Sequence, residues 1–576
     1  MGPHPLNRRA WLQAGAALAT GWGLGGCTPE APSASVAHIA GGFIGANIDR
    51  GHAMRDRLRQ GLPLPAPAAT RRAQVVIAGG GIAALAAARA LRLAGVHDVA
   101  VLELEDSVGG NSRAGQVAGL PCPLGAHYLP VPGDDAAEVQ DLLEELGVRE
   151  RVAGRWQYRD EYLCFSPQER LFRDGEWLEG LLQSQHAAPA TLAQYRRFAA
   201  LVTQAMATQR FSMPALRSWL PGQGVAPAHQ ALDAISFDTW LRQQQLGDPQ
   251  LRWYLDYGCL DDFGAGAARV SAWAGLHYFA SRHGFQAPGE DGEPHDSVLT
   301  WPEGNGWLAR RLAAPAQQAG WLHTGRTVLA IAEERHGVQV DALDVATGTI
   351  ERWQAAHCIV ALPVFIARQV VQNPPPFVAA AAQVLDWAPW LVANVHIRAP
   401  LADRPGAEPA WDNVFYDDVA NGGLGYVNAG HQRLNAQQQL PTVLTCYRAL
   451  AGAQGDPGAA RAALARLAWP EARDAALAPL ARAHPDIFEK ATRIDVMRYG
   501  HAMAIPRPGA QTVLSQIGLQ RPSSKRQQLL NGEQTTLLPT PGSARLHFAH
   551  GDWSGYSVFE EAFTRGHHAA LRALSA

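Results

Sequence analysis

The chain has 576 residues, and its 49 Lys and Arg residues against 52 Asp and Glu residues leave a formal net charge of −3 at pH 7. This balance excludes a basic nucleic-acid-binding platform, so we expect no nucleic-acid partner. Hydrophobic residues make up 47% of a chain that is longer than one hydrophobic core usually serves, which predicts at least two packed domains able to bury a large ligand.

Residues 1–27 are typical of an export signal. Arg8 and Arg9 precede a mildly apolar stretch that is too short to span a bilayer comfortably and that ends at Cys27. The paired arginines resemble the twin-arginine export signal, and the segment before Cys27 resembles a lipobox. These resemblances imply a periplasmic protein that is carried by the twin-arginine export machinery and anchored to a membrane by a lipid on Cys27. An ordinary secretory signal is the alternative.

The next segment, residues 28–72, is rich in Pro, Gly and Ser. Such a composition is typical of linkers, so we expect a tether here with one short helix from about Arg50 to Gln60.

A strand, a glycine-rich turn and a helix are predicted from residue 73 onward. The β-branched run at 74–78 leads into the turn, where Gly79 permits the sharp bend and Gly81 lets the backbone approach a pyrophosphate. Ala84 keeps the following helix close to the sheet. A second strand ends at Glu103, whose carboxylate would accept hydrogen bonds from an adenosine ribose. The combination predicts dinucleotide binding, with an ordinary βαβ turn as the alternative.

The segment after Glu103 resembles the flavin amine oxidase superfamily, which includes monoamine and polyamine oxidases, protoporphyrinogen oxidase and phytoene desaturases. Gly109, Gly110 and Arg113 match the residues that close over the FAD pyrophosphate in that family. Asn111 stands where the family usually has arginine, which removes one charge-assisted phosphate contact.

A second resemblance covers residues 123–129, which are similar to the family loop that runs beside the isoalloxazine ring. It implies that Gly125 and Ala126 contact the flavin and that His127 lies near it. The alternative for His127 is a loop histidine bonded to its own backbone.

Two later segments agree with the family pattern. Three strands are predicted at 328–331, 337–341 and 353–360, and the resemblance places Val328 at the adenine. Residues 546–552 are predicted to form a strand that runs into a turn, and a helix is predicted over Glu561 to Leu574. The resemblance implies that Asp552 binds the ribityl or pyrophosphate part of FAD, with the helix N-terminus directed at the cofactor.

The string from Trp553 to Tyr556 is similar to the one that supplies an aromatic wall before the flavin in monoamine oxidases. Plain packing of Tyr556 is the alternative. The pattern at 304–309 also fits a second dinucleotide turn, but no acid ends the strand that follows it, so we interpret it as the turn that returns the chain to the flavin domain.

Aromatic and acidic residues are concentrated at 251–264 and 270–279. A pocket that mixes aromatic faces with carboxylates would suit a cationic or polar-headed substrate. The interpretation that we favour from the pattern alone is that the aromatic residues form core and that Asp261 and Asp262 are a solvated turn capping a helix.

Lysine and cysteine usage limit the chemistry. The strand at 389–396 lacks the lysine that most amine oxidases of the superfamily hold there, and the chain has only Lys490 and Lys525. No cysteine lies near Trp553, so we expect noncovalent FAD. The five cysteines after Cys27 form no C-x-x-C pair, which predicts no metal site, and Cys358 lies in an apolar run typical of a buried free thiol.

The sequence therefore predicts an α/β protein. A Rossmann-like, doubly wound FAD-binding domain would be built from residues 73–150, 301–370 and 501–576, with an α+β substrate domain inserted as 151–300 and 371–500. The resemblance implies an FAD-dependent oxidoreductase that removes a hydride from a C–N bond of a small amine and passes electrons to O2 or another acceptor. Two alternatives stay open: a desaturase or porphyrinogen-type dehydrogenase acting on a C–C bond, and a non-catalytic, membrane-anchored flavin-binding redox or assembly partner.

Overall fold

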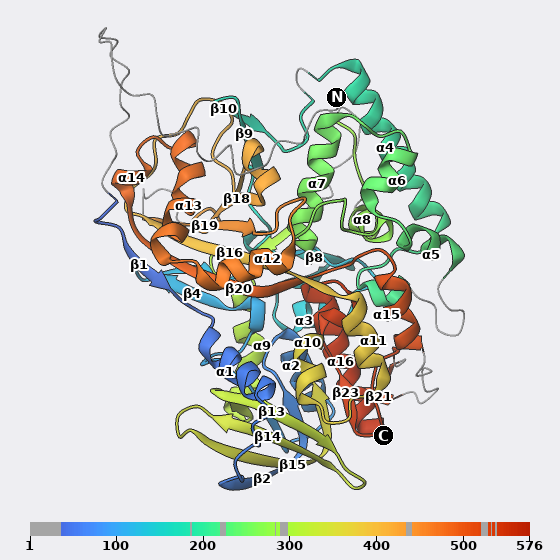
Figure 1. The fold of residues 1–576 in the computed structure, drawn as a ribbon. Helices are drawn as coiled ribbons and strands as arrows, with labels where there is room; N and C mark the ends of the chain where they lie inside the picture. Colours follow the sequence, from blue (N-terminus) through green and yellow to red (C-terminus); the bar gives the residue numbers. More distant parts are fainter. Residues whose placement is uncertain are drawn as a thin grey trace, which may run out of the picture. The chain divides into compact units, whose positions relative to one another are not determined.

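Two β-sheets organise the part of the chain that the structure describes (Figure 1). The computed structural model describes residues 36–184, 187–218, 226–282, 284–288, 298–433, 441–519, 528–530, 533–535 and 538–575. The expected export signal and Cys27 lie outside these ranges. None of the helices within them is long and apolar enough to cross a membrane.

The seven-stranded sheet has the order β12-β3-β2-β15-β14-β13, with β23 also paired to β15. Its strands are β2 (Ala69–Ala78), β3 (Val99–Leu102), β12 (Leu322–His323), β13 (Arg326–Glu333), β14 (Val338–Asp344), β15 (Thr349–Val360) and β23 (Leu546–Phe548). The predicted strands are thus confirmed. β2 pairs in parallel with both β3 and β15. Because the strands come from three separate stretches of chain, the predicted discontinuous assembly of this α/β fold is also confirmed.

Helix α2 (Ile82–Leu93) crosses the C-terminal helix α16 (Phe559–Ser575) beside this sheet. A Cβ at Gly566 would overlap the carbonyl oxygen of Ala83, so the two helices can approach this closely only with glycine at the crossing. Ala84 is fully buried, as expected for a residue that keeps α2 close to the sheet.

The eight-stranded sheet has the order β1-β20-β16-β19-β18-β17-β9-β10. Its strands are β1 (Ala40–Phe43), β9 (Glu169–Arg173), β10 (Glu176–Glu179), β16 (Asp386–Ile397), β17 (Asp412–Phe415), β18 (Gly423–Asn428), β19 (Thr442–Ala449) and β20 (Ala491–Ile505). β16 is buried along nearly its whole length, between neighbours β19 and β20. This strand includes the predicted strand at 389–396.

Four two-stranded ribbons complete the strands of the described chain: β4 (Ala114–Val117) with β5 (Leu120–Pro123), β6 (Tyr128–Pro130) with β11 (Val298–Thr300), β7 (Arg149–Val152) with β8 (Arg155–Tyr158), and β21 (Gln528–Leu530) with β22 (Glu533–Thr535). The other helices are α1 (Ile48–Arg59), α3 (Ala137–Glu145), α4 (Pro189–Thr208), α5 (Pro227–Asp233), α6 (Phe237–Gln243), α7 (Pro249–Phe263), α8 (Ala272–Ala280), α9 (Gly306–Gln318), α10 (Val364–Val370), α11 (Pro376–Val384), α12 (Pro457–Arg466), α13 (Trp469–Ala483), α14 (Ile487–Lys490) and α15 (Ala510–Leu519). Ser236 caps α6, as predicted.

The predicted linker at 28–72 is wrong from residue 40 onward. β1 pairs in parallel with β20, α1 occupies Ile48–Arg59, and β2 begins at Ala69. The backbone N–H of Asn47 donates to Oε1 of Glu105 at 2.9 Å, which ties this segment to the end of β3. Tertiary pairing therefore overrides the linker-like composition, while the short helix expected near Arg50 is confirmed.

The glycine pattern at 304–309 opens α9, and the chain then enters β12, which pairs with β3 in the seven-stranded sheet. The turn at 304–309 and the Gly79 turn therefore both connect to strands of the seven-stranded sheet. The five cysteines within the described ranges are all free thiols, and Cys358 is fully buried, as predicted.

Candidate cofactor and substrate site

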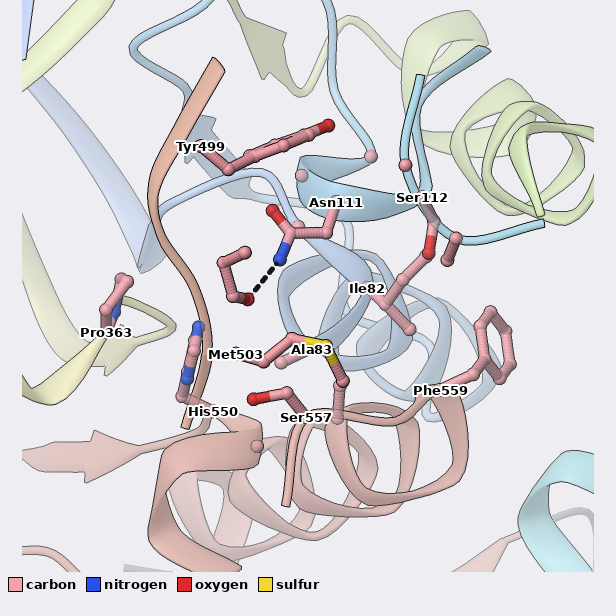
Figure 2. Close-up of a pocket in the computed structure, with 18 of the residues that line it drawn as sticks. Ile82, Ala83, Asn111, Ser112, Pro363, Tyr499, Met503, His550, Ser557 and Phe559 are labelled. Atoms are coloured by element: carbon pink, nitrogen blue, oxygen red, sulfur yellow. Dashed lines mark hydrogen bonds between the residues drawn. The ribbon is translucent and has the colours of Figure 1, made fainter. Parts of the chain in front are cut away.

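A cavity of about 450 Å³ is lined by residues from both large sheets. At one end it is lined by the Gly79 turn, the end of β3 and the start of β13. At the other end it is lined by α7, β16 and the start of α16. Figure 2 shows part of this wall, with Asn111, Tyr499, Met503, His550 and Ser557 around the cavity.

The Gly79 turn needs glycine for steric reasons. Gly79 has φ +101°, and a Cβ there would lie 2.5 Å from the carbonyl oxygen of Ala361. A Cβ at Gly80 would lie 2.6 Å from Oε2 of Glu103. Gly81 is the N-cap of α2 and provides no side-chain cap, so backbone N–H groups of the first turn remain available to an anion in the cavity.

The Gly-Gly turn after β3 lies against the first turn. Gly109 has φ +120° and Gly110 has φ +56°, and a Cβ at Gly110 would lie 3.2 Å from Cα of Gly81. Both residues line the cavity. The two turns thus form one backbone-lined cradle without side chains, which fits a pyrophosphate.

Glu103 lines the cavity beside this cradle and is half-buried. Its Oε1 accepts the backbone N–H of Glu105 at 2.8 Å. Burial, the largest influence, raises the pKa of Glu103 above its ordinary value. A carboxylate that lines the cavity and has spare acceptor capacity fits the hydroxyls of a ribose.

Arg113 does not line the cavity. Its Nη1 donates to the carbonyl oxygen of Gly45 at 2.9 Å, and its Nε donates to that of Gly110 at 3.1 Å. The guanidinium therefore supports the Gly-Gly turn from the side away from the cavity. The resemblance implied a direct contact with the pyrophosphate. Asn111 does line the cavity, and its Nδ2 donates to the carbonyl oxygen of Ala502 at 2.7 Å (Figure 2).

Asp552 faces the cavity at the turn after β23 and is held by several partners. Its Oδ2 accepts the backbone N–H of Val364 at 2.9 Å and Nε1 of Trp387 at 3.2 Å. Its Oδ1 lies 3.2 Å from Nδ1 of His550. Burial alone would raise the pKa of Asp552, but His550 and the hydrogen bonds lower it below its ordinary value. Val328, at the start of β13, also lines the cavity, as do Gly125 and Ala126.

His127 lines the cavity with its ring packed among aromatic side chains. The ring centroid lies 4.5 Å from that of Tyr447, 4.9 Å from that of Tyr128 and 5.4 Å from that of Trp411. Burial lowers the pKa of His127 to about 3, so the ring is neutral. Its backbone is braced because Oγ1 of Thr300 donates to its carbonyl oxygen at 2.8 Å.

Tyr556 lies behind the cavity wall. It is 2% exposed, its ring packs on Phe263 and His277, and its hydroxyl donates to Oδ2 of Asp262. Its neighbours Ser557 to Glu560 are the residues that line the cavity. Its catalytic role, like that of His127, stays a prediction.

Asp261 and Asp262 also line the cavity, so the interpretation of a solvated turn is wrong. They lie in the last turn of α7, and Asp262 is 3% exposed. Oδ2 of Asp262 lies 3.1 Å from Nη1 of Arg282, and Oδ2 of Asp261 accepts the Tyr128 hydroxyl at 3.1 Å. The two carboxylates face the cavity because their partners, Tyr128 and Arg282, come from other segments of the chain. The local sequence pattern does not reveal these contacts.

The sequence pattern missed several residues of the cavity wall. No motif in the sequence marks Arg282 as a cavity residue. Glu560 lies in the first turn of α16, where an acidic residue is common because it stabilises the helix N-terminus. The predicted strand at 389–396 contributes Trp390 and Val392 to the cavity but no lysine. Lys490 pairs with Asp486 away from the cavity, at 2.5 Å, and Lys525 lies outside the described residues.

Comparison with known proteins agrees with this geometry. The model of the family described as flavin containing amine oxidoreductase matches residues 82–574. The chain is 47% identical over 74 residues to the putative flavin-containing monoamine oxidase AofH of Mycobacterium tuberculosis, which covers 13% of this chain and 15% of that protein. It is 32% identical over 170 residues to putrescine oxidase of Kocuria rosea, which covers 29% and 31%.

These alignments span less than a third of either relative. Among solved structures, wild-type putrescine oxidase bound to putrescine has the same fold, with a TM-score of 0.60 and 17% identity over 88% of this chain and 100% of that one. The chain therefore belongs to the flavin-containing amine oxidoreductase family.

Proposed function

We propose that the protein is an FAD-dependent oxidoreductase that removes a hydride from the C–N bond of an amine and passes the electrons to O2 or another acceptor. FAD is the cofactor of the family to which the chain belongs. The observation that carries the proposal is the continuity of the cavity, which joins the glycine cradle and Glu103 to the aromatic and acidic end at Tyr128 and Asp261.

The cradle would hold the nucleotide part of FAD. The N–H groups of the first turn of α2 would bind the pyrophosphate, and Glu103 would accept hydrogen bonds from the ribose. Asp552 is positioned by Val364 and Trp387 to accept hydrogen bonds from the ribityl or pyrophosphate region. When bound, FAD supplies the hydride acceptor. No covalent link is proposed.

The residues at the other end would bind and enclose the amine. Trp390, Tyr447 and Tyr128 provide aromatic surface that limits access of water to the reacting C–N bond. His127 presents a neutral ring, so it adds no positive charge that would repel an ammonium group.

A second candidate is supported by the absence of lysine. Neither β16 nor any other described part of the cavity wall provides one, and the resemblance implies that desaturases and protoporphyrinogen oxidase work without it. A desaturase or porphyrinogen-type dehydrogenase acting on a C–C bond is therefore the alternative. A non-catalytic flavin-binding redox or assembly partner is a third possibility, which the same experiment tests.

Anaerobic reduction of the purified yellow protein tests these functions. Bleaching of the 450 nm flavin band by amines supports the first proposal. Bleaching only by a hydrophobic polyene or tetrapyrrole would instead support the C–C dehydrogenase. A flavin that no compound of these classes reduces would support the non-catalytic partner.

We also propose that the protein is exported through the twin-arginine machinery and anchored by lipid at Cys27, with the folded chain in the periplasm. The paired residues Arg8 and Arg9 and the lipobox-like segment before Cys27 support this proposal. The variant R8K/R9K is expected to remain inside the cell. Cys27→Ser should be exported yet released from membranes, so its retention in the membrane fraction would contradict the anchor.

A further inference from the structure

The N-terminal strap, residues 40–59, connects the two large sheets. It contains β1 and α1. β1 extends the eight-stranded sheet, where it pairs in parallel with β20, and α1 packs against β13 of the seven-stranded sheet (Figure 1). The strap precedes the residues that match the family model, which begin at residue 82. It therefore joins the two sheets that line the cavity without being part of the family match.

The strap is fixed to the chain that follows β3. Both carboxylate oxygens of Glu105 accept the backbone N–H of Asn47, at 2.9 and 3.1 Å. Nη1 of Arg50 donates to the carbonyl oxygen of Leu104 at 2.8 Å, and its Nη2 lies 2.8 Å from Oδ1 of Asp106. These contacts hold the first turn of α1 beside Leu104, which lines the cavity next to the glycine cradle.

Gly51, the fourth residue of α1, also lines the cavity. A Cβ at this position would meet no heavy atom of the described residues within 4 Å beyond its own helix. Glycine inside a helix is less favourable than alanine, because it loses more backbone freedom on folding. No protein contact therefore requires glycine here, and the open space beside Gly51 is available to a ligand in the cavity.

We propose that the strap is part of the FAD-binding site: Gly51 leaves room for the adenosine of FAD, and α1, held by Arg50, slows the release of the cofactor. This inference rests on the proposed FAD-dependent function. The adenosine belongs at this end because Glu103 is suited to its ribose, and because the cavity wall here is formed by the end of β3 and the start of β13.

The first test changes the space at Gly51. Gly51→Leu should raise the Kd for FAD at least tenfold in fluorescence titration of the full-length apoprotein, because the leucine side chain would occupy the room left for adenosine. Leucine favours a helix more than glycine does, so the variant apoprotein should melt no lower than the parent. A residue with only a structural role would not combine weaker binding with undiminished stability. Ala53→Leu, at an exposed position of the same helix, should leave FAD binding unchanged.

Fragments of the cofactor locate the effect. ADP carries the adenosine end of FAD, and FMN carries the flavin end. Gly51→Leu should weaken the competition of ADP with FAD at least tenfold and leave the competition of FMN unchanged. Failure of ADP to compete with FAD in the parent, or equal weakening of both fragments, would contradict the placement of adenosine beside Gly51.

The second test measures the release of FAD from the holoenzyme. Arg50→Ala removes the contacts with Leu104 and Asp106, so FAD should dissociate at least tenfold faster, as followed by the fluorescence of released flavin after dilution. Arg59→Ala, a change of an exposed arginine at the end of α1, should release FAD at the parent rate. Equal release by Arg50→Ala and the parent would contradict the retaining role of α1.

The outcomes separate this inference from the proposed function. A yellow protein whose FAD affinity is unaffected by Gly51→Leu, and whose FAD release is unaffected by Arg50→Ala, would overturn the role of the strap alone. A parent chain that binds no FAD would instead contradict the proposed function itself.

Discussion

The hydroxyl of Tyr556 donates a hydrogen bond to Asp262, and Asp262 forms the ion pair with Arg282. All three side chains are largely buried, so this chain of contacts connects the segment before α16 to the end of α7. The contacts hold Asp262 in the cavity wall and keep Arg282 neutralised.

Tyr556→Phe is expected to lower the free energy of unfolding by about 1.5–3 kcal/mol, because the variant removes a buried hydrogen bond to a charged acceptor. FAD content should not change. Denaturant unfolding followed by tryptophan fluorescence measures the effect. Tyr416→Phe is the matched control, since its hydroxyl bonds to no described residue. A large loss of kcat with unchanged stability would contradict a packing role and show that the Tyr556 hydroxyl takes part in catalysis.

Gly79→Ala is expected to yield colourless protein. The new Cβ would lie 2.5 Å from the backbone oxygen of Ala361, so the turn must shift and the cradle is lost. Gly95→Ala is the control, since Gly95 also has positive φ (+77°) but its Cβ would meet open space; it should cost about 1 kcal/mol and keep FAD. The bound FAD per protein, measured from the absorbance spectrum, distinguishes the two variants. A yellow, FAD-loaded Gly79→Ala protein would contradict the assigned cradle.

Glu103→Gln is expected to raise the Kd for FAD by about 10- to 100-fold, since hydrogen bonds to charged groups contribute about 1.5–3 kcal/mol and tenfold corresponds to about 1.4 kcal/mol. Burial raises the pKa of Glu103, so its carboxylate is protonated at a higher pH than an exposed glutamate, and FAD should dissociate more readily as the pH falls. Fluorescence titration of apoprotein with FAD at several pH values checks both effects. Glu145→Gln, on the surface of α3, should change neither.

Glu561→Gln is expected to destabilise the fold by about 3–5 kcal/mol, because it leaves the buried guanidinium of Arg565 without its countercharge. Glu561 accepts the Ser554 hydroxyl, and Arg565 donates to the carbonyl oxygen of Trp553 at 3.0 Å. Thermal unfolding should show a lower melting temperature, with earlier release of FAD because the same residues hold the turn that contains Asp552. A melting temperature equal to the parent's would contradict this role.

Local sequence patterns were sufficient to predict the positions of the glycine turn, of α2 and of Glu103 after β3. Glycine positions and hydrophobic periodicity determine a βαβ unit within about thirty residues. They were insufficient where contacts join distant segments. β1 pairs with β20 across more than 400 residues, so composition alone suggested a linker. Asp261 and Asp262 face the cavity because Asp261 accepts a hydrogen bond from Tyr128, and Asp262 accepts one from Tyr556 and pairs with Arg282. Arg113 lies beside the Gly-Gly turn as expected, but its guanidinium donates to the backbone carbonyl oxygens of Gly110 and Gly45 and does not line the cavity.

If the protein is anchored through Cys27 as proposed, the pairing of β1 with β20 would also limit its distance from the membrane. A tether over residues 28–72 would have allowed a long reach, but the first strand of the described chain already begins at Ala40. Under the proposed lipid anchoring, only twelve residues separate Cys27 from the sheet. Fully extended, they span roughly 40 Å, so turnover would be confined to a thin layer next to the bilayer surface.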